Sequence, residues 1–333
     1  MRRPPILQMK YGCYPFLVVF GLPANLLTII ILSRGKCGLS KCISAYMTMM
    51  AVADLLVILI NVLVYEILIF RLSNSFLHYT EVLKATVYLV AVTLELSLWY
   101  TVAFTGDRYV SICCQKFKTK YCRVKIARIL AAVILAVACL ENIPFLFALQ
   151  PQQIVGNISW GILPKLDILN SPTFVAFSRF KSFRNLLCVF GLIFLFNAMT
   201  ARLILVASKS RRGFRIHKST TERDTEMENR KKGIMLLFCV SGSFMLFWLP
   251  STVTNFIVNL TMFSDRDYYS ARYFAAQTGT LLTNMSSCIN TCTYATTQTN
   301  FRGELKSLIM SPWTLIRALT KTNVSSSKAL SPK

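Results

Sequence analysis

The sequence is poor in charged residues, and acidic residues are the scarcest. Charged residues make up 15% of the 333 residues, with 14 aspartates and glutamates against 37 lysines and arginines. Hydrophobic residues make up 54%, whereas soluble globular domains average about 25% charged residues and about 45–50% apolar ones. The composition therefore argues against a water-soluble protein and favours one that lies in a membrane.

Residues for metal or nucleophilic chemistry are also few. Both histidines, His78 and His217, fall in predicted loops, and the cysteines contain no C-x-x-C pair. A metal centre or a nucleophile–base pair has no residues to form it, so we do not predict an enzyme. Only Cys13 and Cys188 are placed to reach the outer side, where a disulfide between them stays an open alternative.

Long hydrophobic runs are abundant. Seven blocks of about 20 residues or more occur at 11–33, 43–70, 84–110, 126–149, 182–207, 233–261 and 272–298, and a helix of that length crosses a hydrocarbon core of roughly 30 Å. The runs are too long and too uniformly apolar for the alternating strands of a barrel. We predict an all-α membrane protein, a seven-transmembrane helix bundle spanning residues 11–298.

The tail from 299 to 333 is predicted to begin with a short amphipathic helix on the membrane surface. Phe301, Leu305 and Leu308 recur at helical spacing, with Arg302 and Lys306 between them. Such a pattern is typical of helices that lie in the bilayer interface.

Basic residues set the predicted orientation. The first, third and fifth connections between spans are rich in lysine and arginine, although Arg2, Arg3 and Lys10 oppose them. The positive-inside rule places these connections in the cytoplasm, with residues 1–10 extracellular and the tail cytoplasmic, in a multi-pass plasma-membrane protein. Basic residues distributed this way do not predict nucleic-acid binding. Asn157 lies in an N-I-S sequon of the fourth connection and is a predicted glycosylation site.

Ionisable residues inside the spans carry the functional information. Each costs about 2.5–3.5 kcal/mol on insertion scales, and the set comprises Asp54, Glu66, Glu95, Asp107, Arg108 and Glu141. Any single one is explained equally well by a helix-packing hydrogen bond. Their number favours a functional role.

Five fragments in five spans carry a family resemblance. They are GLPANLLT, MAVADLL, GDRYV, FMLFWLP and NTCTY followed by Phe301. In order and spacing they resemble the rhodopsin-like (class A) G-protein-coupled receptors. GLPANLLTIIILS, SLWYTVAFTGDRY, a fourth span without tryptophan and a seventh-span motif without its proline look most similar to the orphan G-protein coupled receptor 139 subgroup.

The resemblance implies a receptor that passes an extracellular small-molecule or peptide signal to a heterotrimeric G protein of the Gq type. Asp107, Arg108 and Tyr109 would form the cytosolic switch, with Arg108 released when the sixth helix swings outward. Arg230 occupies the place where many members carry a carboxylate that holds this arginine. We therefore expect measurable basal signalling.

The sixth and seventh spans complete the predicted switch. Proline kinks a helix, so Pro250 with Trp248 forms a hinge that can couple a ligand pocket to the cytosolic half. Simple packing of the indole is the alternative. Asn290 and Tyr294 would relay the movement, but Thr291 stands where the family usually has proline, which puts the bend in the seventh span in doubt.

Asp54, Ser97 and Asn290 are predicted to meet at mid-membrane depth, with Asn25 nearby. A carboxylate among hydroxyl and amide oxygens suits a hard cation, and the resemblance implies an allosteric sodium ion, the one candidate cofactor. A hydrated polar packing cluster is the alternative.

The ligand pocket is predicted in the outer half of the bundle, among Glu66, Val90, Arg184, Trp248, Ser251 and Asn255. Val90 stands at the depth where amine receptors carry an aspartate, so a simple amine lacks its partner. Opposite charges among aromatic side chains suit a zwitterion such as an aromatic amino acid. Ser251 replaces an arginine of related receptors, and Arg184 is the other candidate for a ligand carboxylate.

Two other functions stay open. A receptor fold that no longer signals is the main alternative, because of Thr291 and the missing outer cysteine pair. A transporter is the lesser one, since the chain shows no two related halves.

Overall fold

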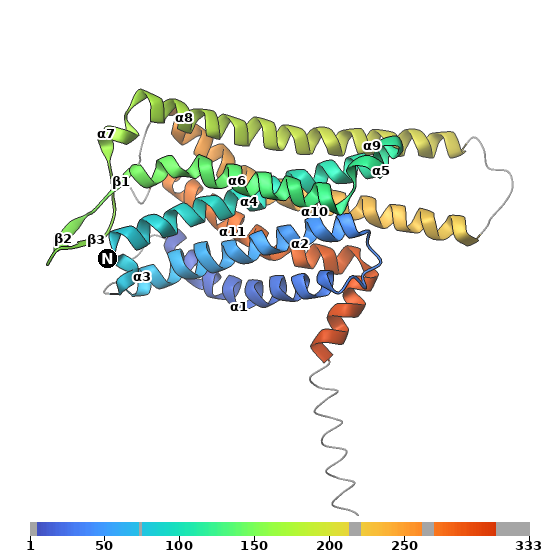
Figure 1. Ribbon diagram of the computed structural model, residues 1–333, viewed down its shortest axis with the longest axis horizontal. Coiled ribbons are helices and arrows are strands. Elements are labelled where there is room, and N and C mark those ends of the chain that lie inside the picture. The colour runs from blue at the N-terminus through green and yellow to red at the C-terminus, as the bar shows by residue number, and fades with distance from the viewer. Residues whose placement is uncertain (1–4, 73–74, 213–220, 262–269, 311–333) are drawn as a thin grey trace, which may run out of the picture.

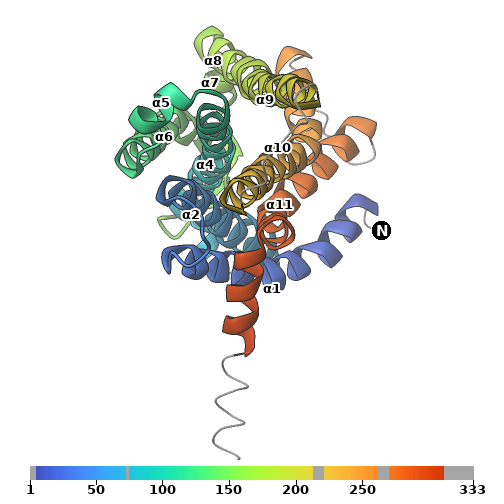
Figure 2. The same cartoon turned by 90° about the vertical axis from the view of Figure 1, so that its right-hand side faces the viewer.

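The computed structural model describes residues 5–72, 75–212, 221–261 and 270–310. Within them the chain forms seven long helices, which pack side by side into a bundle (Figures 1 and 2). Their bounds are α1 (Pro5–Ser33); α2 (Lys41–Leu56), continued by the π-helix η1 (Val57–Leu68) and α3 (Ile69–Arg71); α4 (Thr80–Cys113); α6 (Val124–Phe147); α8 (Pro172–Phe183), continued by the π-helix η3 (Arg184–Val189) and α9 (Phe190–Arg212); α10 (Thr221–Thr261); and α11 (Ala271–Thr297).

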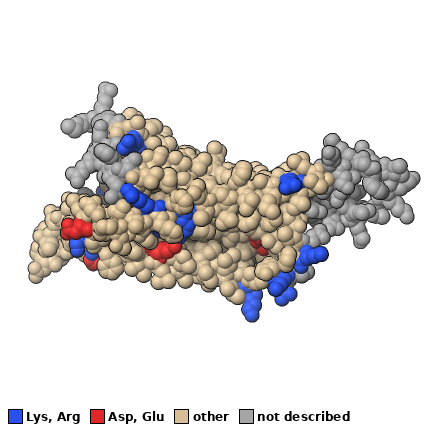
Figure 3. Space-filling model, turned by 90° about the horizontal axis from the view of Figure 1, so that it is seen from above, with Lys and Arg blue, Asp and Glu red and all other residues tan. Residues whose placement is uncertain are grey.

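Six of these helices are long and apolar enough to cross a membrane. The seventh, α11, is richer in threonine, serine and asparagine, and it packs between α1 and α10. In Figure 3 most of the surface between the two ends is uncharged. The predicted seven-helix membrane bundle is confirmed.

Several helices extend beyond the hydrophobic runs that predicted them. The first begins at Pro5 instead of residue 11, and the fifth begins at Pro172 instead of residue 182. Hydropathy marks only the apolar part of a helix, whereas the backbone continues until a cap stops it. Ser171 provides that cap for α8, because its side chain accepts from the Phe174 amide and Pro172 follows as the first helical residue.

Short elements close the two ends of the bundle. They are η2 (Phe76–His78), α5 (Gln115–Tyr121), β1 (Leu149–Gln150), β2 (Gln153–Val155), β3 (Ile158–Trp160), β4 (Leu163–Pro164) and α7 (Leu166–Leu169). The four strands lie at one end, here called the hairpin end, and α5 lies at the opposite end (Figure 1). The last residues of α4, which include Arg108, lie beside α5, and this end is here called the Arg108 end.

The predicted all-α fold therefore gains a small antiparallel hairpin in the fourth connection. Strands β2 and β3 pair Gln153 with Trp160 and Val155 with Ile158. Gly156 and Asn157 both have positive φ, 55° and 65°. Two residues with positive φ are typical of the two-residue loops that connect the strands of a β-hairpin. Asn157 is exposed at this tip.

Residues 299–310 form a helix that turns away from the bundle axis (Figure 2). Phe301 is fully buried and meets the Tyr294 ring edge-on, with centroids 6.1 Å apart. The Arg302 guanidinium donates to the Ala295 and Thr296 carbonyls at 3.0 and 2.9 Å. A cation on the last carbonyls of a helix stabilises its C-terminus, so this helix is joined firmly to the end of α11.

Candidate functional site

Asp107, Arg108 and Tyr109 lie near the end of α4. Arg108 forms an ion pair with the adjacent Asp107, and both are almost completely buried. The Cys42 thiol of α2 donates to Asp107 Oδ1 at 3.2 Å. Tyr109 stacks on Phe196 of α9 with ring centroids 5.3 Å apart. The arginine is thus held by its own helix, while a thiol links the aspartate to α2.

Within the described residues, Arg108 makes no hydrogen bond or ion pair with α10. Its Nε atom is buried and has no hydrogen-bond partner among them. Arg230 belongs to α10, but its side chain lies outside the described residues. The ion pair within α4 can therefore open without separating two helices.

The centre of the bundle gathers Asp54, Ser97 and Asn290 from α2, α4 and α11. Ser97 Oγ donates to Asp54 Oδ1 at 2.8 Å, and Asn290 Nδ2 donates to Asp54 Oδ2 at 2.7 Å. Asn25, which was predicted to lie near these residues, makes no hydrogen bond to Asp54 in the described structure. Its Nδ2 donates instead to the Gly21 and Ser287 carbonyls. The aspartate is 1% exposed and has no cationic partner among the described side chains.

This centre presents oxygen atoms of the kind that coordinate a sodium ion. Ser287 Oγ is buried without a hydrogen-bond partner in the described part of the chain. Together with the Asp54 carboxylate and the Ser97 hydroxyl it offers oxygen ligands around an uncompensated charge. Hard cations prefer such oxygens, so the residues fit the ion.

Trp248 and Pro250, the residues of the predicted hinge, both lie inside α10. The Trp248 indole is 6% exposed and stacks on Phe244 with ring centroids 5.3 Å apart. Its Nε1 donor has no partner among the described residues. A buried indole that lacks a hydrogen-bond partner is free to respond to a polar group placed above it.

Helix α11 runs through position 291 without interruption. The Thr291 hydroxyl lies 3.0 Å from that of Thr28 on α1. Asn290 contacts Asp54, as described, and Tyr294 is completely buried with an unpartnered hydroxyl within the described bundle. Threonine therefore joins α11 to α1 where the resemblance leads one to expect a proline.

A cavity of about 340 Å³ opens between the helices toward the hairpin end. Of the six predicted pocket residues it is lined by Trp248, Ser251 and Asn255. Val90 does not line it, because the α4 face turned to the cavity carries Val87, Ala91 and Leu94.

Glu66 lies elsewhere, in a cluster between α1, η1 and α11. It accepts from Lys10 Nζ at 2.9 Å and from the Tyr14 hydroxyl at 3.3 Å. Lys10 also donates to Gln277 at 2.6 Å. Since α1 begins at Pro5, the lysine predicted to precede the first span lies inside its helix and neutralises this glutamate.

The charged wall of the cavity was not predicted as a group. Lys181 Nζ lies 2.8 Å from Glu95 Oε2 and donates to Asn142 Oδ1 at 2.7 Å. Asn142 Nδ2 in turn donates to Glu95 Oε2 at 2.9 Å. All three line the cavity. The signal in the sequence was Lys181 itself, one helical turn before Arg184 and on the same face, but the predicted span started after it.

Arg184 faces the other side of the same wall. It forms ion pairs with Glu95 and Glu141, and its guanidinium lies over the Trp99 ring, 5.4 Å from the centroid. It lines a second cavity, on the side of the bundle between α4, α6 and α9. Glu95 borders both cavities.

Cys13 and Cys188, the pair considered for a disulfide, are both free thiols. Cys13 lies in α1 and Cys188 in η3, and Cys188 is exposed on the bundle surface.

Comparison with known proteins agrees with this arrangement. The profile of the family described as seven transmembrane receptor (rhodopsin family) matches residues 24–294. C-C chemokine receptor type 1 of Macaca fascicularis is 24% identical over 311 residues, which cover 92% of this chain and 81% of that receptor. The probable G-protein coupled receptor npr-8 of Caenorhabditis elegans is 28% identical over 107 residues, 32% of this chain and 21% of that protein. The chain therefore belongs to the rhodopsin family of G-protein-coupled receptors, multi-pass membrane receptors that are not enzymes.

Proposed function

We propose that the chain is a plasma-membrane receptor for a small zwitterionic molecule of the size and shape of an aromatic amino acid, or for a short peptide ending in one. The hairpin end is extracellular in this proposal, since it carries Asn157 and the opposite end carries the basic connections. Asn157 is the glycosylation site.

The observation that carries the proposal is the charge pair in the cavity wall. Lys181 and Glu95 present opposite charges in a cavity of about 340 Å³, with Trp248 also lining it. A ligand carboxylate can take the place of Glu95 at Lys181, while a ligand ammonium finds Glu95. The aromatic side chain then packs among Phe145, Leu98 and Trp248.

The signal follows from differential binding. A ligand that contacts Trp248 favours the state in which the cytosolic half of α10 has moved outward about Pro250, and only tighter binding to that state can shift the population. Opening of the Asp107–Arg108 pair exposes Arg108 to the G protein.

The test is a G-protein activation screen in transfected cells, with tryptophan, phenylalanine, tyrosine and short aromatic peptides. In Lys181→Met the potency of the active ligand falls by about ten- to a hundredfold, the loss of one charge-assisted hydrogen bond worth about 1.5–3 kcal/mol. Lys84→Met is the matched control, because Lys84 pairs with Glu81 on the surface of α4. Equal potency in wild type and Lys181→Met would overturn the assignment of the ligand.

The polar centre is proposed to hold an allosteric sodium ion, with Asp54, Ser97 and Asn290 around it. The uncompensated burial of Asp54 and the unpartnered hydroxyl of Ser287 support the proposal. When bound, the ion would supply the positive charge that offsets the cost of burying the aspartate.

The finer placement is the orphan G-protein coupled receptor 139 subgroup, with coupling to a Gq-type protein. The first-span and third-span fragments and the absence of tryptophan from the fourth span support it. Calcium release, compared with cyclic AMP change in the same cells, tests the coupling.

A receptor fold that no longer signals is the second candidate, favoured by Thr291 and by the free thiols Cys13 and Cys188. It predicts the second-messenger level of untransfected cells. The receptor proposal predicts basal activity above that level, because no described contact ties Arg108 to α10, and loss of that activity in Arg108→Ala. A transporter would instead show solute or proton flux.

A further inference from the structure

Helix α11 is hydrogen-bonded to α1 along much of its length. Lys10 Nζ donates to Gln277 Oε1 at 2.6 Å, and Asn25 Nδ2 donates to a carbonyl of α11 at 2.9 Å. Closer to the Arg108 end, the hydroxyl oxygens of Thr28 and Thr291 lie 3.0 Å apart. Gln277 and Thr291 are fourteen residues apart, which corresponds to about 21 Å of helix. The two helices are therefore joined at several levels of the bundle.

The same two helices pack closely. A Cβ added at Gly21 of α1 would lie 2.7 Å from Cys288 Sγ of α11 and 3.2 Å from Ile58 Cγ1 of η1. The Cys288 thiol also donates to the Leu17 carbonyl of α1 at 3.7 Å. Small residues let helices approach each other closely in membranes, so Gly21 brings α1 within reach of the polar groups of α11.

Helix α11 is also hydrogen-bonded to the second span. Asn61 Nδ2 of η1 donates to Asn284 Oδ1 at 2.8 Å, and Asn290 donates to Asp54 of α2, as described. Hydrocarbon offers no replacement for such a bond, whereas lipid tails replace an apolar contact at little cost. These polar contacts therefore resist the separation of α11 from its neighbours.

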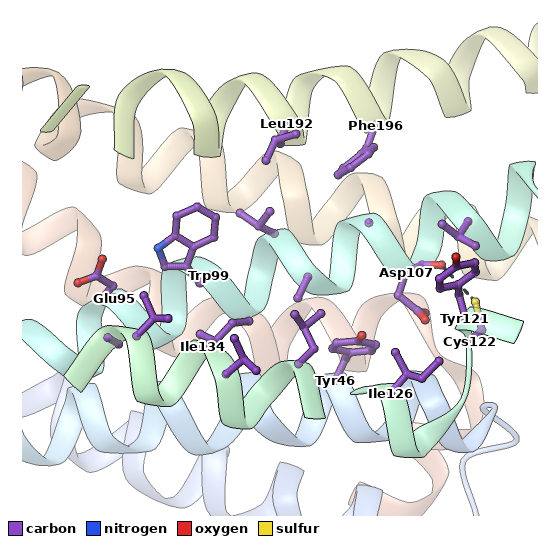
Figure 4. Close-up of a pocket in the computed structure, with 18 of the residues that line it drawn as sticks. Tyr46, Glu95, Trp99, Asp107, Tyr121, Cys122, Ile126, Ile134, Leu192 and Phe196 are labelled. Atoms are coloured by element: carbon purple, nitrogen blue, oxygen red, sulfur yellow. Dashed lines mark hydrogen bonds between the residues drawn. The ribbon is translucent and has the colours of Figure 1, made fainter. Parts of the chain in front are cut away.

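The third span joins the same set of helices. Ser97 of α4 donates to the other oxygen of Asp54. Asp107, at one end of the second cavity in Figure 4, accepts from the Cys42 thiol of α2 at 3.2 Å. Hydrogen bonds thus connect α1, α2 with η1, α4 and α11, which are here called the bonded core.

The half of α10 at the Arg108 end is held differently. Leu237 and Val240 are fully buried there and make apolar contacts only, which lipid can replace. Asn197 Nδ2 of α9 donates to Ser241 Oγ at 2.8 Å, and Gln298 Nε2 reaches a carbonyl of α10 at the long distance of 3.4 Å. This half of α10 can therefore leave the bundle without breaking the bonded core.

We propose that α11 is a fixed helix of this receptor, held to α1 by the Thr28–Thr291 pair, and that the switching movement is confined to α10. A proline at position 291 would free a carbonyl and permit a bend. Threonine instead keeps α11 continuous and adds a bond to α1. The inference rests on the proposed function, because it divides the proposed switch into a moving and a fixed part.

The test links α11 covalently to α1. In Thr28→Cys/Thr291→Cys the sulfur atoms replace two oxygens that lie 3.0 Å apart, a short movement from the disulfide length of about 2.05 Å. Oxygen with copper phenanthroline forms the disulfide, and dithiothreitol reduces it. The oxidised receptor in nanodiscs, without ligand, should load a mixture of heterotrimeric G proteins with GTPγS at the same rate as the reduced receptor. A loss of exchange that dithiothreitol restores would overturn the inference.

Asn197→Cys/Ser241→Cys is the matched variant, because its disulfide links the moving half of α10 to α9. Oxidation of this variant should lower the exchange rate to that of G protein without receptor. Unchanged exchange would contradict the assignment of the movement to α10. Wild type oxidised in the same way controls for the native thiols.

A distance measurement tests the inference even in a receptor that does not signal. Spin labels at the exposed Ser33 and Thr296 report the separation of α1 and α11, and labels at Ser33 and Met235 report that of α1 and α10. The exposed native cysteines are first replaced by serine.

Pulsed electron paramagnetic resonance of the labelled receptor with nucleotide-free G proteins should give one distance for the α1–α11 pair and two for the α1–α10 pair. Two distances for α1–α11 would overturn the inference. One distance for both pairs would contradict the proposed function and the movement of α10.

Discussion

Asp54 and Glu95 are two buried carboxylates with opposite surroundings. They are 1% and 5% exposed. Asp54 accepts hydrogen bonds only from neutral donors, the Ser97 hydroxyl and the Asn290 amide. Glu95 is paired with Lys181 and Arg184. Equal burial thus leaves one site with a net negative charge and cancels the charge at the other.

The difference assigns the two carboxylates different roles. A buried charge that only neutral groups stabilise attracts a cation, so Asp54 suits a site whose occupancy changes with receptor state. A carboxylate between two cations braces the helices that carry them, here α4, α8 and η3. Glu95 therefore stabilises the wall between the proposed ligand pocket and the second cavity, both of which it lines.

The largest expected effect comes from Glu95→Gln. The substitution leaves Lys181 without its carboxylate and Arg184 with Glu141 alone, and breaking a buried pair costs about 3–5 kcal/mol. The unfolding temperature of the purified receptor in detergent should fall accordingly. Glu141→Gln is the control, because Glu141 is 26% exposed and has one partner. An equal fall in the unfolding temperature of both variants would show that Glu95 contributes no more to stability than Glu141.

Asp54→Asn should not lower the unfolding temperature measured without sodium. Sodium chloride is expected to stabilise the wild type against heat more than choline chloride at equal ionic strength, by about 2.7 kcal/mol at a hundredfold excess over the dissociation constant. The variant should lose this difference and be at least as stable as the wild type without sodium, because a neutral amide needs no countercharge. Sodium stabilisation that persists in the variant would contradict a cation site at Asp54.

The smallest effect is expected at the surface pair Lys84–Glu81 on α4. Lys84 Nζ lies 3.0 Å from Glu81 Oε1, but the Glu81 side chain is 82% exposed. Exposed pairs three residues apart on a helix contribute about 0.2–0.5 kcal/mol. Lys84→Met should therefore leave the unfolding temperature almost unchanged, and a large fall would show that burial does not set the scale of these effects.

The bundle could be predicted from the sequence because lipid imposes a simple rule. Runs of about 20 apolar residues become helices whatever their neighbours are. The same rule hides helical residues that are polar, so residues 172–181 were not included in the fifth span, and Lys181 was missed.

The candidate site was partly predictable for a related reason. Asp54, Ser97 and Asn290 do come together, because a polar group in an apolar span has few other partners. Glu66 and Val90 do not line the cavity. This could not be predicted, because hydropathy does not show which face of a helix points inward, nor that Lys10 pairs with Glu66. The Cys42–Asp107 contact has no sequence signal, because a thiol on an apolar helix resembles any small core residue.

The helix at 299–310 has a mechanical consequence. Phe301 packs against the Tyr294 ring, and the Arg302 guanidinium donates hydrogen bonds to carbonyls near the end of α11. A displacement of this helix would therefore act directly on Tyr294, whose side chain is completely buried in the bundle. The direction of the helix at 299–310 and the packing at the end of α11 are therefore coupled, at the end of the bundle opposite the hairpins.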